Sequence, residues 1–186
     1  MGGIRNLLIM PGLLYGSRAP AGNCIIKIMQ TPPENKQEKH TREPRLLGFY
    51  GRSNSGKTTL VERLVGDLAS AGWRVAAVKV SEQAVSMDQP GKDSWRYAQA
   101  GARTVALAAQ GETGIIVRGE MDMRRLLEAL ALLSQPQLVL VEGAREDFIP
   151  KVRLGKIELR ANTLRDYDGD YARLLDWIKE LLQEKE

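Results

Sequence analysis

The sequence contains one cysteine, Cys24, and one histidine, His40, among 186 residues. A single cysteine excludes an internal disulfide framework and a thiolate-rich metal site. A single histidine argues equally against a metal centre or an acid–base centre built from several imidazoles. Disulfide-stabilised proteins, and proteins whose metal or acid–base site is built from several cysteines or histidines, are therefore excluded.

The folded part of the chain has no excess of positive charge. The formal net charge is +4, but residues 1–45 carry seven Lys/Arg and three Asp/Glu, whereas residues 46–186 carry twenty of each. Nucleic-acid binding by the domain is not supported. No apolar run is long enough to cross a bilayer. We therefore expect neither a nucleic-acid partner nor a membrane partner.

Residues 1–45 are predicted to lie outside the domain. The apolar run near the start is interrupted by Pro11, and Arg18 stands where a secretion signal needs an uncharged cleavage region. Thr31–Arg45 (TPPENKQEKHTREPR) is proline-rich and charged, which is typical of a disordered linker. Because Met29 lies just before it, we expect a mobile tail or an over-extended reading frame. Residues 46–186 would form one cytoplasmic domain.

From residue 46 onward, apolar strands alternate with amphipathic helices. We expect strands at Leu46–Tyr50, Arg74–Val80, Thr104–Ala109, Thr113–Val117, Gln137–Val141 and Lys156–Arg160. We expect helices from near Lys57 to Leu68 and at Asp93–Ala100, Asp122–Ser134 and Asp170–Gln183. This order predicts an α/β fold with a mainly parallel sheet covered by helices on both faces. Ligands of such sheets bind at the carboxyl ends of the strands.

A glycine-rich stretch between the first strand and the first helix fits the pattern G-x-x-x-x-G-K-[ST]. It runs from Gly51 to Thr58 (GRSNSGKT). Glycine lets several backbone N–H groups converge on one anion, and the start of the helix adds the positive end of its dipole. The pattern predicts a P-loop NTPase fold whose phosphate-binding residues are Gly51, Ser53, Asn54, Ser55, Gly56, Lys57, Thr58 and Thr59. The alternative is a flexible turn that only joins strand to helix.

Three charged residues are predicted near the carboxyl ends of strands. Glu142 follows an apolar strand, and its carboxylate could hold Mg²⁺ or orient a nucleophile, or could be an ordinary strand-end charge. Lys79 ends another apolar strand. It could be a second cation at the γ-phosphate, or an ordinary surface lysine. Asp88 lies in a loop entering a helix. It could provide a second Mg²⁺ carboxylate, whereas Asp93 or Ser94 could cap that helix.

Several motifs together resemble the molybdopterin-guanine dinucleotide biosynthesis protein B (MobB) family. They are the P-loop of Gly51–Leu60, the strand ending at Lys79 after a G-x-R-V turn, D-x-P-G-K-D-S from Asp88, and V-L-V-E-G at Val139–Gly143 followed by Pro150–Lys151 and a short strand. The resemblance spans residues 46–160. It implies a GTP-binding protein whose magnesium is held by Thr58, Asp88 and Glu142. With Lys57 and Lys79, Glu142 would support weak GTPase activity.

The resemblance also implies a homodimer that works beside a molybdopterin nucleotidyltransferase and assists attachment of GMP to molybdopterin. Two departures stand out. Val80–Gln83 replaces the histidines that usually follow the strand-end lysine, and residues 161–171 show no further strand and no guanine signature N-K-x-D. No glutamine or arginine is clearly placed to assist hydrolysis, although Arg52 and Arg145 are candidates. We therefore expect slow turnover.

Two other functions remain open from the sequence. One is an ATP-dependent ligase or kinase of the dethiobiotin synthetase type, in which Lys79 would help to activate a small acceptor. The other is a nucleotide-switched partner protein that serves another cofactor pathway. Nucleotide preference distinguishes the first from a GTP-binding adapter, and hydrolysis that quickens only with a partner favours the second.

Overall fold

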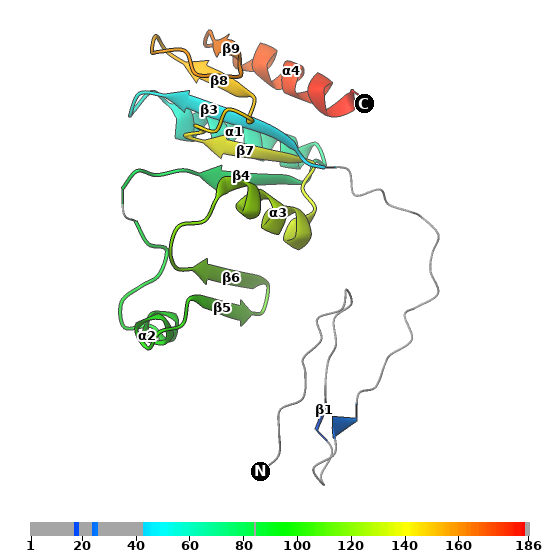
Figure 1. The fold of residues 1–186 in the computed structure, drawn as a ribbon. Coiled ribbons are helices and arrows are strands. Elements are labelled where there is room, and N and C mark those ends of the chain that lie inside the picture. Colours follow the sequence, from blue (N-terminus) through cyan, green and yellow to red (C-terminus); the bar gives the residue numbers. More distant parts are fainter. Residues whose placement is uncertain (1–16, 19–23, 26–42, 84, 185–186) are drawn as a thin grey trace. The chain divides into compact units, whose positions relative to one another are not determined.

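The computed structural model describes residues 17–18, 24–25, 43–83 and 85–184 (Figure 1). The chain divides into two units, Met1–Lys39 and His40–Glu186. In the first unit, strands β1 (Ser17–Arg18) and β2 (Cys24–Ile25) pair in antiparallel fashion. Most of residues 1–45 lie outside the described residues, so the predicted tail stays a prediction.

The second unit contains a five-stranded sheet in which every strand pair is parallel. Its order is β4-β7-β3-β8-β9. The strands are β3 (Arg45–Gly51), β4 (Val75–Lys79), β7 (Leu138–Glu142), β8 (Lys151–Leu154) and β9 (Thr163–Tyr167). The P-loop strand β3 is thus central, and the predicted α/β architecture is confirmed.

Helices cover both faces of this sheet. Helices α1 (Lys57–Ser70) and α4 (Tyr171–Gln183) share one apolar core with the side chains of Leu47 and Phe49 on β3. Helix α3 (Met123–Ser134) packs through Leu127 on the opposite face, in front of the sheet in Figure 1. Because side chains alternate along a strand, β3 contributes to both cores.

Helix α2 (Asp93–Gln99) and a separate hairpin lie between β4 and α3 in the sequence. The hairpin pairs β5 (Thr104–Ala109) with β6 (Glu112–Val117) in antiparallel fashion, as predicted. No side chain caps the start of α2. The Ser94 hydroxyl instead donates to Asp88 Oδ1 at 2.8 Å.

Two sequence-based predictions about the C-terminal part are wrong. Lys156–Arg160 is not a strand, because the buried strand in this region is β8, where Val152 is fully buried beside β3. Residues 161–171 do contain a further strand, β9. Its sequence, TLRDY, is largely polar and therefore does not resemble a buried strand. The strand lies at the edge of the sheet and is stabilised by pairing with β8 and by two 2.7 Å hydrogen bonds from Arg153 to Asp166.

Residues 143–150, the crossover loop, connect β7 to β8 without a helix. The two strands flank β3, so this loop must pass over β3, and it does so at Gly48. A Cβ atom on Gly48 would lie 2.4 Å from the Ala144 Cβ atom. The fully buried Lys151 holds the loop, because its Nζ donates to the carbonyls of Glu146 (2.6 Å), Ile149 (3.0 Å) and Ala161 (2.8 Å).

Candidate phosphate-binding site

The glycine-rich loop turns tightly between β3 and α1. Asn54 and Gly56 have positive φ angles of 60° and 83°, a conformation that glycine and asparagine adopt most readily. Gly51 permits a close approach, since a Cβ atom there would lie 2.7 Å from the Leu154 carbonyl oxygen. Helix α1 begins directly after the loop, at Lys57. The free N–H groups of its first turn can therefore face a bound anion.

The loop lines a cleft of about 700 Å³ at the carboxyl end of β3. The structure brings together here nearly all of the residues that the sequence selects. They are Gly51, Ser53, Asn54, Ser55, Gly56, Lys57, Thr58, Thr59, Lys79 and Glu142. The cleft is large enough for a nucleotide-sized ligand.

Thr58, Glu142 and Lys79 meet in this cleft. The Thr58 hydroxyl donates to Glu142 Oε1 at 2.7 Å, and Lys79 Nζ lies 3.6 Å from the same oxygen. The sheet sets this arrangement, because Lys79 on β4 is the register partner of Glu142 on β7. A hydroxyl beside a carboxylate is a fitting ligand pair for Mg²⁺, which takes its remaining ligands from phosphates and water. In residues 43–83 and 85–184 no group of three or more His, Cys, Asp or Glu forms a ready metal cluster.

Lys57 folds back over its own loop. Its Nζ donates to the carbonyl oxygens of Arg52 at 2.5 Å and Gly51 at 3.1 Å. These partners are neutral carbonyls, so a phosphate at the loop would offer the ammonium a stronger, charged acceptor.

Asp88 does not join this group. Its side chain is 3% exposed and is not among those lining the cleft. Oδ2 pairs with Arg118 at 2.7 Å, and Oδ1 accepts from Ser94. In this arrangement Thr58 and Glu142 fit a magnesium ion and Asp88 does not. A metal role for Asp88 stays a prediction that requires both of these contacts to be released.

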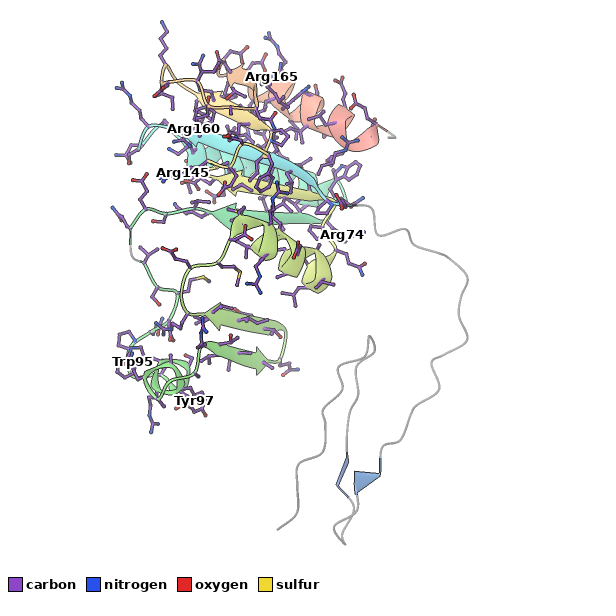
Figure 2. The ribbon with its side chains drawn as sticks, in the orientation of Figure 1. Arg74, Trp95, Tyr97, Arg145, Arg160 and Arg165 are labelled. Atoms are coloured by element: carbon purple, nitrogen blue, oxygen red, sulfur yellow. The ribbon has the colours of Figure 1, made fainter. Side chains whose placement is uncertain are left out.

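Among the cleft residues that sequence reasoning did not select are Tyr50 and Arg160. Arg160 lies in the loop after β8, over the ring of Tyr50, and belongs to no recognisable motif. Arg145, a candidate from the sequence, lines the cleft and pairs with Glu82. Arg145 and Arg160 lie at the same end of the sheet in Figure 2. Arg52 is not among the lining residues.

The strand, glycine-rich loop and helix, with a carboxylate ending the neighbouring parallel strand, define the fold of the P-loop NTPases. The match to a particular family covers residues 46–172. The chain belongs to that family, described as molybdopterin guanine dinucleotide synthesis protein B.

Individual relatives agree with this assignment. The chain is 38% identical over 120 residues to the molybdopterin-guanine dinucleotide biosynthesis adapter protein of Haemophilus influenzae, covering 61% of this chain and 65% of that protein. It is 33% identical over 113 residues to the adapter protein of the same description from Escherichia coli, covering 58% and 64%. The chain thus spans a little under two thirds of the length of these relatives.

Solved structures support the fold. The crystal structure of Bacillus subtilis MobB matches with a TM-score of 0.60 at 22% identity, over 76% of this chain and 99% of that one. A crystal structure of molybdopterin-guanine biosynthesis protein B matches with a TM-score of 0.54 at 26% identity, over 75% and 99%. In the part of the chain that the structure describes, no helix has the length and apolar character to span a bilayer.

Proposed function

We propose that this protein is a GTP-binding adapter of molybdenum cofactor biosynthesis, which assists conversion of molybdopterin to its guanine dinucleotide form in the cytoplasm. The observation that carries the proposal is the joined geometry of the P-loop, Thr58 and Glu142 in a chain of this family. The relatives named as adapter proteins support the pathway.

The phosphate end of the cleft would bind Mg²⁺–GTP. Thr58 and Glu142 would hold the ion, which when bound neutralises phosphate charge and polarises the γ-phosphate. Lys57 and Lys79 would bring further positive charge to the β- and γ-phosphates. Turnover would be slow, because the buried cleft carboxylate, Glu142, would hold the ion, and the other, Glu82, is exposed and pairs with Arg145.

The partner of the adapter would be the molybdopterin nucleotidyltransferase. The test measures formation of the guanine dinucleotide from molybdopterin and Mg²⁺–GTP by that enzyme, with and without this chain. We expect the wild-type protein to increase product formation and Lys57→Ala to give no increase. Lys156→Ala, which changes an exposed lysine outside the cleft, is the matched control. No stimulation by the wild-type protein would reject the proposal.

We also propose that the protein is a homodimer and that the hairpin contributes to its interface. A two-stranded hairpin alone is marginally stable in water. Here Ile115 and Val117, which lie on the same face of β6, are 47% and 44% exposed. A second copy that covers these side chains would complete the packing.

The oligomeric state tests this interface directly. Sedimentation equilibrium should give a dimer for the wild-type chain and a monomer for Ile115→Glu combined with Val117→Glu. Leu164→Glu, on the edge strand β9, changes a similarly exposed apolar residue and should stay dimeric. A wild-type monomer, or a hairpin double variant that remains dimeric, would reject the interface.

One observation favours a second candidate, the ATP-dependent ligase or kinase. The Lys79 side chain is 64% exposed within the cleft, so its ammonium could contact an acceptor as well as a phosphate. A preference for ATP over GTP, together with turnover that depends on an added small acceptor, would favour this candidate over the adapter.

A further inference from the structure

Arg160 carries a positive charge in the cleft without a carboxylate partner among the described residues. One side-chain hydrogen bond is made, from Nη1 to the carbonyl oxygen of Ala144 at 2.7 Å. The other cleft arginine, Arg145, is neutralised by Glu82. A guanidinium has five N–H donors, so most of those on Arg160 remain for another acceptor.

The side chain and backbone of Arg160 are held in place from two sides. Its guanidinium carbon lies 4.9 Å from the centroid of the Tyr50 ring, and Tyr50 is 1% exposed. The Arg160 N–H donates to the Tyr50 hydroxyl at 3.1 Å, and the Arg160 carbonyl accepts from the Thr163 hydroxyl at 2.6 Å. A stacked and anchored arginine loses little side-chain freedom when it binds an anion.

A second cation lies close to Arg160. Burial lowers the pKa of Lys151 and the charge of Arg160 lowers it further, whereas Asp147 and Glu146 raise it. The Lys151 ammonium donates to three backbone carbonyls and Lys151 is fully buried, so it cannot contact a ligand in the cleft. Of these two cations, Arg160 is the one that lines the cleft.

Arg160 and the two lysines of the cleft come from different elements. Lys79 ends β4 and Lys57 begins α1, whereas Arg160 follows β8 and reaches the carbonyl of Ala144 after β7. A ligand group at Arg160 can therefore differ from the β- and γ-phosphates that Lys57 and Lys79 would bind. The planar fork of a guanidinium matches a phosphate bidentately, which a point-like ammonium does not.

We propose that Arg160, stacked on Tyr50, binds a second phosphate group in the nucleotide cleft, a proposal that rests on nucleotide binding by the P-loop. This phosphate has two possible sources. One is the α-phosphate of the bound nucleotide itself. The other is the phosphate monoester of a second ligand that occupies the cleft together with the nucleotide.

The test compares Arg160→Gln with the wild-type full-length chain by calorimetry. Arg165→Gln is the matched control. Arg165 also lies over an aromatic ring, 4.7 Å from the centroid of Trp177, but it does not line the cleft. Arg160→Lys keeps the positive charge and loses the planar fork of the guanidinium. It replaces Arg160→Gln in the test if the glutamine variant fails to fold.

The first arm titrates GTP, GDP and pyrophosphate in the presence of Mg²⁺. If Arg160 binds the α-phosphate, Arg160→Gln weakens GTP and GDP binding by about tenfold or more and leaves pyrophosphate binding unchanged, since pyrophosphate needs only the P-loop. Arg160→Lys should show a smaller loss. Arg165→Gln should match the wild type with all three ligands.

The second arm titrates inorganic phosphate into protein saturated with a non-hydrolysable GTP analogue. If Arg160 binds the monoester of a second ligand, the wild-type protein binds phosphate under these conditions, and Arg160→Gln loses this binding while keeping its GTP affinity. Arg160→Lys should again bind phosphate more weakly than the wild type.

Three results would overturn the proposal. They are unchanged binding by Arg160→Gln in both arms, an equal loss in Arg165→Gln, and, where the glutamine variant does not fold, wild-type binding by Arg160→Lys in both arms. Failure of nucleotide binding as a whole is a separate result. It would appear as weak GTP binding by the wild-type chain that Lys57→Ala does not reduce further.

Discussion

Replacing Glu142 with glutamine should remove magnesium dependence while leaving the fold intact. Glu142 Oε1 accepts the Thr58 hydroxyl at 2.7 Å, and an amide oxygen can accept the same hydrogen bond. The ion pair with Lys79 is lost, but the Lys79 nitrogen lies 3.6 Å from Glu142 Oε1 and its side chain is 64% exposed, whereas the Glu142 side chain is 12% exposed. A long pair to a solvated lysine contributes about 1 kcal/mol or less, so the free energy of unfolding should change by about 1 kcal/mol or less.

The effect of Glu142→Gln on ligand binding should be much larger. A neutral amide is a poor ligand for a hard dication, so the increase in GTP affinity caused by Mg²⁺ should fall by about tenfold or more. Calorimetry with GTP in Mg²⁺ and in EDTA measures the effect of Mg²⁺ on GTP affinity. Urea unfolding measures the free energy of unfolding. Glu158→Gln, on an exposed side chain outside the cleft, is the control.

Two outcomes would refute this reasoning. If Glu142→Gln keeps the full Mg²⁺ effect at unchanged stability, then Glu142 is not a metal ligand. If the variant loses about 3 kcal/mol or more of stability, the Glu142 carboxylate is a structural group whose charge the fold needs.

Three further predictions concern stability. Gly48→Ala should lower the free energy of unfolding in urea by about 1–3 kcal/mol or more, because its Cβ would meet the Ala144 Cβ at 2.4 Å; an unchanged midpoint would mean that the crossover loop yields freely. Gly66→Ala, inside α1 with nothing near its Cβ position, should raise it by about 0.5–1 kcal/mol, and a decrease would contradict the open surroundings. Hydrogen bonds from Arg153 lower the pKa of Asp166, so the wild type should be more stable than Asp166→Asn above the ordinary carboxyl value of 3.8 and lose this advantage as the pH falls through the lowered pKa. Thermal melts whose difference does not shrink as the pH falls below 3.8 would contradict this prediction.

Much of the fold could be predicted because local patterns and packing agree. The strand of Leu138–Glu142 is fully apolar until its last residue, and the structure buries it on both faces. Asp122 and Asp170, at which two of the predicted helices begin, both accept backbone N–H groups. The edge strand β9 was missed because its polar alternation resembles a loop until its pairing with β8 is known.

The residues of the site also fall into those that the sequence predicts and those that it does not. The P-loop residues carry their spacing in the sequence, and the parallel-sheet rule places Glu142 and Lys79 beside them. Arg160 could not be found this way, because it reaches the cleft only through its stacking on Tyr50 and its bond to Ala144. Asp88 is the opposite case, a residue that the sequence selects but that does not line the cleft. A family motif selects it, but Arg118 and Ser94 hold it away from the cleft.

The most direct test of the central claim is equilibrium binding of GTP and ATP, each with Mg²⁺, to the full-length chain and to Lys57→Ala. The account predicts that GTP binds more tightly than ATP and that Lys57→Ala weakens GTP binding by at least about tenfold. Equal affinity of Lys57→Ala and the wild type for GTP, or a clear preference of the wild type for ATP, would contradict it.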